Sequence, residues 1–205
     1  HVKHGDFLRG MKNQKNNPAL SRLKKEIRRL KGLLERDELT GLLNRRGFKL
    51  VLEKIFQEVH WTRRHPEKRK SVRVESLAIL FLDIDHFKKL NDQYGHDVGD
   101  QALRFIARLI GDRLRGIDLV SRWGGEEIVV GLLGANQTAA RVVAEDIRQL
   151  IASSPLKVKG KKILLSVSIG VASLNKERNL DELIDKADKV MYQAKKRGRN
   201  LVRVG

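Results

Sequence analysis

The run SLAILFLDID, residues 76–85, is the feature that most limits what this chain can fold into. It is apolar without interruption from Leu77 to Leu82 and then carries two aspartates, Asp83 and Asp85. A strand with one solvated face alternates apolar and polar residues, whereas a strand covered on both faces is apolar throughout. The run therefore predicts a buried central strand that ends in carboxylates.

A β-hairpin is the second constraint on the fold. DLVSRW at 118–123 and EEIVVGLL at 126–133 are strand-like runs, and only Gly124 and Gly125 separate them. Two glycines between strands favour a tight hairpin, because the primed turns need a positive φ. The two adjacent glutamates that follow are then expected at the hairpin tip.

The remaining segments alternate between helical and strand-like patterns. Helical spacing predicts helices at 48–59, around 87–90, and at 103–114, 138–153 and 180–198. A strand is expected at 161–174, where Leu164, Val167 and Ile169 supply much of the apolar side, and a last edge strand at 200–204.

Polar residues in the segment before the central strand predict where a helix begins and where a loop follows. Asp37 or Thr40 is expected to cap a helix, and residues 60–75 read as a polar, basic loop. From residue 76 onward the order is strand, helix, helix, strand, strand, helix, strand, helix, strand. That order predicts an α+β fold, a palm-like and mostly antiparallel sheet flanked by helices.

Composition limits the partners and the compartment. With 205 residues and no cysteine, the chain has room for one substantial core and forms neither disulfides nor thiolate metal sites. No apolar run approaches the roughly 20 residues of a membrane span. The formal net charge of +18 favours an anionic partner, whether nucleic acid, nucleotide or lipid surface, without choosing among them.

The basic excess is concentrated in residues 1–36, which hold eleven Lys or Arg against three acids, and in the segment 61–74. The domains expected are therefore a basic N-terminal segment, 1–36, and a globular domain, 37–205. A seam of apolar residues from Leu20 to Leu34 is spaced 3, 4, 3, 4. It fits either one amphipathic helix packed on its own domain or the end of a parallel two-stranded stalk.

The acidic residues also allow two interpretations. In the expected topology the central strand ends beside the hairpin tip, so Asp83 and Glu126 face each other. Two such carboxylates repel unless a cation lies between them, and hard oxygen ligands suit Mg²⁺ or Mn²⁺. The alternative is that the glutamates are solvated turn residues and that Asp83 caps a strand end.

Five blocks of sequence resemble the GGDEF family of diguanylate cyclases in order and spacing. The blocks are DELTGLLNRRGF at 37–48, LDIDHFKKLNDQYGHDVGD at 82–100, RGIDLVSRWGGEEI at 115–128, SVSIGVA at 166–172 and ADKVMYQAKKRGRN at 187–200. The resemblance covers residues 37–203, about four fifths of the chain. The family string is GGEEI here, so Glu126 retains a carboxylate, whereas Ile128 replaces phenylalanine and is expected to alter packing beneath the hairpin.

The resemblance implies a nucleotidyl cyclase-like palm that condenses two GTP molecules into cyclic di-GMP and releases two pyrophosphates. It implies that Mg²⁺ or Mn²⁺ is held by Asp83, the Ile84 carbonyl, Glu126 and Glu127. It implies catalytic roles for Glu126, Glu127 and Lys88. It implies GTP-binding roles for Asn91 and Asp100 at guanine, and at the phosphates for Gly124, Gly125, Lys88, Lys195 and Arg199.

The resemblance also implies regulation. Each domain binds one GTP, so the active form is a homodimer, and the Leu20–Leu34 seam resembles the stalk that connects such domains to an upstream sensor. Arg115 and Asp118 match the RxxD site at which cyclic di-GMP inhibits, although an Arg and an Asp at this spacing also form ordinary surface ion pairs. The expected compartment is the cytoplasm.

Two other functions remain as alternatives. A catalytically silent receptor or signalling scaffold would bind cyclic di-GMP through Arg115 and Asp118, but such a protein should have lost its metal carboxylates. A nucleic-acid-binding protein is suggested by net charge alone. No recognition helix, zinc site or aromatic platform is present in the sequence, so no specific nucleic-acid partner is expected.

Overall fold

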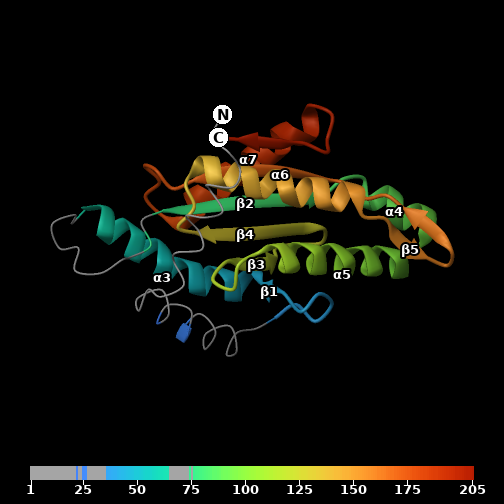
Figure 1. Ribbon diagram of the computed structural model, residues 1–205, viewed down its shortest axis with the longest axis horizontal. Coiled ribbons are helices and arrows are strands. Elements are labelled where there is room, and N and C mark those ends of the chain that lie inside the picture. Colours follow the sequence, from blue (N-terminus) through green and yellow to red (C-terminus); the bar gives the residue numbers. More distant parts are fainter. Residues whose placement is uncertain (1–21, 23–24, 27–35, 65–73, 75) are drawn as a thin grey trace, which may run out of the picture.

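The computed structural model describes residues 22, 25–26, 36–64, 74 and 76–205 (Figure 1). The seam from Leu20 to Leu34, predicted to form a stalk, lies outside the described residues, and so does most of the predicted basic loop. The division between segment 1–36 and domain 37–205 therefore stays a prediction. Within the described part of the chain, no helix is long and apolar enough to cross a membrane.

The helices and strands follow one another in an α+β order. They are β1 (Leu43–Asn44), α3 (Arg45–Arg64), β2 (Leu77–Ile84), α4 (Phe87–Tyr94), α5 (His96–Arg113), β3 (Leu119–Arg122), β4 (Glu127–Leu133), α6 (Gln137–Ser153), β5 (Leu156–Val158), β6 (Lys161–Ile163), β7 (Val167–Ser173), α7 (Leu180–Lys196) and β8 (Val202–Val204).

A six-stranded sheet in the order β1-β3-β4-β2-β7-β8 forms the centre of the molecule (Figure 1). β2 lies between β4 and β7 and is antiparallel to both. β3 is antiparallel to β4, whereas β1 and β8 pair in parallel with β3 and β7. The predicted mostly antiparallel α+β sheet is confirmed, and the run 76–85 is its central strand.

β2 is buried on both faces because helices cover the sheet on both sides. Leu80 and Leu82 pack in one core cluster with residues of α4, α5 and α6. Ile79 and Phe81, on the opposite face, pack in a second cluster with residues of α3 and α7. Every residue of β2 is buried, which is why its sequence shows no polar alternation before Asp83.

The hairpin is present, but its predicted two-residue turn is wrong. β3 ends at Arg122 and β4 begins at Glu127, so the tip runs from Trp123 to Glu126. The Trp123 N–H donates to the Glu127 carbonyl at 2.8 Å, and neither glycine has a left-handed φ. A Cβ at Gly124 would lie 2.6 Å from the Glu127 carboxylate, so any other residue there would displace that carboxylate.

The single strand predicted at 161–174 is also wrong. β6 and β7 divide this segment, and β6 pairs with β5 in a separate two-stranded sheet. Lys159 and Gly160, at φ 48° and 77°, form the turn between β5 and β6, as short hairpin loops require. Leu164 belongs to the link that joins β6 to β7 and is 71% exposed, whereas Val167 and Ile169 are buried as predicted.

The helix start predicted at Asp37 or Thr40 is a turn. The Asp37 carboxylate accepts hydrogen bonds from the Thr40 N–H at 2.9 Å and the Thr40 hydroxyl at 2.7 Å. α3 begins later, where the Asn44 side chain accepts from the Gly47 N–H at 2.9 Å. α3 then continues to Arg64, into the segment predicted as a loop.

Candidate functional site

The end of β2, the tip of the β3–β4 hairpin and the last turn of α7 meet at one end of the sheet. Asp83 pairs with Glu127 in the β2–β4 register, and the Ile84 N–H donates to the Glu126 carbonyl at 3.4 Å. The sheet thus brings the central strand and the hairpin tip side by side, as predicted. α7 reaches the same place, because the Lys195 ammonium lies 2.6 Å from the Asp83 carboxylate.

α7 can lie this close to the sheet because β7 contains Gly170. A Cβ at this position would lie 2.0 Å from the Ala187 carbonyl oxygen and 2.3 Å from the Met191 nitrogen. Real Cβ atoms do not approach backbone atoms so closely, so only glycine fits without moving the helix. The close packing of α7 on β7 therefore determines how near Lys195 lies to Asp83.

Asp83 is a buried carboxylate with two different oxygens. The residue is 5% exposed, and Oδ2 forms the ion pair with Lys195. Oδ1 is buried and has no hydrogen-bond partner among the residues that the structure describes. Burial raises the pKa of Asp83 to about 6, with Lys195 opposing the shift and the charges of Glu126 and Glu127 adding to it.

Glu127 belongs to the same electrostatic cluster. Burial raises its pKa, and the negative charges of Asp188 and Glu126 raise it further, against Lys195 and Arg45. Asp188, on α7, was not among the residues singled out in the sequence. Burial and then the charge of Asp185 raise the Asp188 pKa as well.

A divalent cation fits these residues. Within the described ranges, no group of three or more His, Asp or Glu side chains could hold a metal by itself. Mg²⁺ and Mn²⁺ need fewer protein ligands, since they keep waters and share phosphate oxygens. The unpartnered Asp83 Oδ1 supplies one hard ligand, and the Ile84 carbonyl, Glu126 and Glu127 are the further ligands expected.

The residues predicted to read guanine lie on adjacent helices. Asn91 is on α4 and Asp100 is on α5, and both are half-buried. Asn91 Oδ1 is buried and has no hydrogen-bond partner within the described structure. A Cβ on Gly99 would lie 1.9 Å from this oxygen, so Gly99 brings α5 against the Asn91 amide.

The predicted phosphate-binding cations differ in their surroundings. Lys195 is paired with Asp83, with 26% of its side chain exposed. Lys88, on α4, and Arg199, directly after α7, are exposed. The structure thus brings Lys195 to the carboxylates and leaves Lys88 and Arg199 at the solvent side.

The predicted inhibitory pair, Arg115 and Asp118, is far from the hairpin tip. Arg115 donates to both Asp118 carboxylate oxygens at 2.9 and 2.7 Å and to the Leu133 carbonyl at 2.7 Å. Asp118 is 4% exposed and also accepts from the Leu133 N–H at 3.2 Å. The pair therefore fastens the α5–β3 loop to the end of β4, roughly 20 Å along that strand from the tip.

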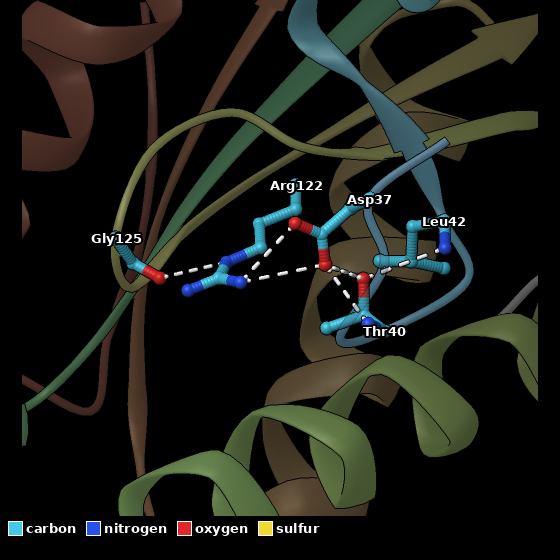
Figure 2. Close-up of polar contacts among 5 residues, drawn as sticks. All are labelled: Asp37, Thr40, Leu42, Arg122 and Gly125. Atoms are coloured by element: carbon cyan, nitrogen blue, oxygen red, sulfur yellow. Dashed lines mark hydrogen bonds and ion pairs between the residues drawn. The ribbon is translucent and has the colours of Figure 1, made fainter. Parts of the chain in front are cut away.

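An ion pair missed in the sequence fastens the hairpin tip to the N-terminal turn. Figure 2 shows Arg122 between the two: its Nε donates to the Gly125 carbonyl at 3.0 Å, and its Nη1 lies 3.2 Å from the Asp37 carboxylate. Burial raises the pKa of Asp37, but hydrogen bonds from Thr40 and the charge of Arg122 outweigh it, so the net pKa is lowered. Arg122 lies two residues before the predicted Gly124–Gly125 turn, but nothing in the pattern links it to a residue 85 positions away.

Two other residues of the hairpin have packing roles. Ile128 is 1% exposed and packs in the core, so the position after the two glutamates lies beneath the hairpin as expected. Trp123 packs edge-on against Phe48 and Phe81, with ring centroids 6.0 and 6.3 Å away. The Arg45 guanidinium covers the Trp123 ring at 4.5 Å, so this ring is a packing element.

Known proteins share this arrangement. The family described as diguanylate cyclase, GGDEF domain, matches residues 34–201. Diguanylate cyclase A of Treponema denticola is 42% identical over 129 residues, which cover 62% of this chain and 35% of that protein. The response regulator PleD of Caulobacter vibrioides is 39% identical over 169 residues, which cover 81% of this chain and 35% of PleD. The chain thus spans about a third of the length of these relatives.

A solved structure agrees with the sequence match. The GGDEF domain of DgcB from Caulobacter crescentus, in complex with c-di-GMP, has a TM-score of 0.72 and 29% identity. The similarity covers 82% of this chain and 94% of that domain, which confirms the palm-like fold. The chain therefore belongs to the GGDEF domain family of diguanylate cyclases.

Proposed function

We propose that this chain is an active diguanylate cyclase that condenses two GTP molecules into cyclic di-GMP and releases two pyrophosphates. The observation that supports this most is Asp83, whose buried Oδ1 lacks a hydrogen-bond partner among the described residues and lies beside the two hairpin glutamates. A buried carboxylate oxygen without a partner costs stability, and such atoms are retained mainly where they bind or react.

Each side chain of the site then has a role. Asn91 and Asp100 bind the guanine edge, because an amide and a carboxylate match its donors and acceptors. Gly124 and Gly125 let the hairpin backbone approach the phosphates closely. Lys195, Lys88 and Arg199 bind the phosphate oxygens and oppose the charge that develops during transfer. These three cations come from α7, α4 and the turn that follows α7.

The carboxylates of the site are proposed to bind the metal ion. Mg²⁺ or Mn²⁺ would be held by Asp83, Glu126, Glu127 and the Ile84 carbonyl, and would supply positive charge at the α-phosphate and the attacking hydroxyl. Lys195 already neutralises one oxygen of Asp83. Its flexible ammonium is therefore placed to bind Asp83 and a phosphate oxygen at once.

The active form is proposed to be a homodimer in the cytoplasm, where GTP is available. One domain binds one GTP, so two domains must face each other before two nucleotides can react. Residues 1–36 connect this domain to an upstream sensor, and cyclic di-GMP acts as an inhibitor at Arg115 and Asp118. The side chain of Arg115 is 37% exposed, so a phosphate or a guanine can approach it from the solvent.

Incubation with GTP and Mg²⁺ tests the proposal, with product identified by chromatography and mass spectrometry. Wild-type chain is expected to form cyclic di-GMP and pyrophosphate, and Glu126→Gln is expected to lower the rate at least about 100-fold. Arg141→Ala, on the exposed side of α6, is the matched control and should behave as wild type.

The same experiment separates the silent receptor from the enzyme. A receptor would bind cyclic di-GMP in calorimetry, lose that binding in Arg115→Ala, and leave GTP unchanged at any protein concentration. No product from wild type under conditions that promote pairing would contradict the enzyme.

A further inference from the structure

The turn that follows α7 has an unusual backbone. Gly198, Arg199 and Asn200 have φ values of 115°, 65° and 44° in succession. Left-handed φ values are uncommon in residues other than glycine, and a protein retains them only where surrounding contacts over-determine the conformation. Two such residues in a row therefore need an explanation.

Asp85 fixes this turn from the side of β2. The residue is 7% exposed, and its Oδ2 accepts a hydrogen bond from the Asn200 N–H at 2.9 Å. The hydroxyls of Ser166 and Ser168 donate to the same carboxylate at 2.8 and 2.7 Å. Asp85 is thus a buried acid with three donors, and one of these donors is the backbone of the turn.

α6 and α7 fix the same turn from two other directions. The Arg148 guanidinium donates to the Asn200 side-chain oxygen at 2.9 Å and is itself held by Glu145 at 2.7 Å. The Arg199 N–H donates to the Ala194 carbonyl at 3.2 Å. Hydrogen bonds of this kind end a helix where the chain turns at a glycine, which here is Gly198. The backbone of Arg199 is therefore held between the end of α7 and Asn200.

These contacts align residues 195–200 with the end of β2. Lys195 contacts Asp83, and Asn200 contacts Asp85, two residues farther along the same chain segment. Arg199 lies between these two attachments. Its position relative to Asp83 is thus set by rigid elements on either side.

We propose that Asp85, Asn200 and Arg148 form a clamp that positions Arg199 for the triphosphate of GTP. This inference rests on the proposed function and deepens it, because it assigns positioning roles to three residues that do not themselves touch the substrate. On a flexible turn the Arg199 guanidinium would spend most of its time away from the phosphates, whereas the clamp fixes the backbone from which this side chain extends.

A double-mutant cycle between Arg148 and Arg199 tests the clamp with the full chain. Arg148→Ala and Arg199→Ala are each expected to raise the KM for GTP about tenfold, since both remove the same phosphate contact. Arg148→Ala should have no further effect when Arg199 is already alanine, because coupled residues are not additive. Arg141→Ala, on the same helix, is the control for loss of a surface charge.

Asn200 gives a second and independent test. Asn200→Gly keeps the left-handed backbone and the N–H to Asp85 but removes the side chain that Arg148 holds, whereas Asn200→Val opposes the backbone itself. The valine variant should have the larger increase in KM for GTP, and both variants should keep wild-type affinity for guanosine, which lacks phosphates. Thermal unfolding of each variant shows whether it is folded.

The clamp is overturned if Arg148→Ala has wild-type KM, if the two substitutions in the cycle are additive, or if guanosine affinity falls together with GTP affinity. The proposed function has a separate readout. A wild-type chain that neither binds nor consumes GTP overturns both, whereas an active wild type with unaffected variants overturns the clamp alone.

Discussion

Asp83 concentrates the functional chemistry of this domain in one side chain. Its Oδ2 faces Lys195, while its Oδ1 is buried with no hydrogen-bond partner in the described structure. Asp85, two residues later, is equally buried but accepts three hydrogen bonds. These two acids, one at the end of β2 and one directly after it, thus have different roles, since Asp85 organises the backbone and Asp83 is left available to a ligand.

The raised pKa of Asp83 predicts how stability depends on pH. Its pKa of about 6 in the folded state lies above the ordinary value of 3.8, so between these values the folded state binds more protons than the unfolded state. Stability without metal therefore falls as pH rises from 4 to 7. Asp83→Asn should gain roughly 2–3 kcal/mol in free energy of unfolding relative to wild type over this range.

Urea denaturation at pH 4 and pH 7, without divalent ions, measures this difference. Asp112→Asn, at an exposed position of α5, is the control. An Asp83→Asn variant whose stability relative to wild type is the same at both pH values would contradict the account of Asp83.

Sequence alone indicated these acids but not their partners. The apolar run before Asp83 and the glycines before Glu126 mark two places where carboxylates meet the end of a core. The hydrogen bonds of Asp85 and the ion pair of Lys195 join segments more than 80 positions apart, and no local pattern specifies them. Such pairings depend on how the elements pack, so periodicity could not reveal them.

At the scale of elements, the β3–β4 hairpin is fixed by its partners more than by its turn. Arg122 joins the Gly125 carbonyl to Asp37, so the tip cannot move without the N-terminal turn (Figure 2).

Arg122→Lys should expose that dependence. A lysine keeps the charge but cannot bind Gly125 and Asp37 at once with a planar fork. The variant is expected to lose about 1 kcal/mol of stability and about tenfold in kcat/KM, measured by urea unfolding and initial rates. In an Asp37→Asn background the same substitution should cause a smaller loss of stability and of kcat/KM. Equal losses in both backgrounds would argue against a contact shared by Arg122 and Asp37.

Gly170 gives the corresponding prediction for α7. Gly170→Ala would place a methyl group 2.0 Å from the Ala187 carbonyl oxygen, so α7 must shift. We expect the free energy of unfolding to fall by at least 1–3 kcal/mol, roughly the loss that overpacking causes. Gly111→Ala is the matched control, since nothing lies within 4 Å of a Cβ there and alanine favours a helix. Thermal unfolding checks both, and a neutral Gly170→Ala would contradict the close packing described.

Elements with strong periodicity were predicted well, and those decided by turn chemistry were not. β2, α6 and α7 follow from apolar spacing, because each buries a continuous face. The β5–β6 hairpin was missed because each of its strands has only three residues, and β6 joins β7 in one run of strand-like sequence at 161–174. β1 has only two residues and carries no pattern of its own.

For the whole molecule, the central expectation is that one domain is half of an enzyme. The rate of cyclic di-GMP formation should rise with the square of protein concentration while sedimentation shows monomer, and in proportion to it once dimer predominates. Activity proportional to concentration in a purely monomeric sample would contradict the two-domain reaction.

The net charge of the whole chain affects how nucleotides reach the site. The whole chain has a formal net charge of +18, so anionic nucleotides are attracted to the protein even though the candidate site contains several carboxylates. The association rate for GTP should therefore fall as ionic strength rises.

Crystals grown with Mn²⁺ and a nonhydrolysable GTP analogue test the central claim most directly, because anomalous scattering locates manganese independently of refinement. The account predicts a peak about 2.1 Å from Asp83 Oδ1, shared with the Ile84 carbonyl, Glu126 and the analogue's phosphates. Bound nucleotide with Asp83 Oδ1 turned away and no manganese beside it would contradict the account.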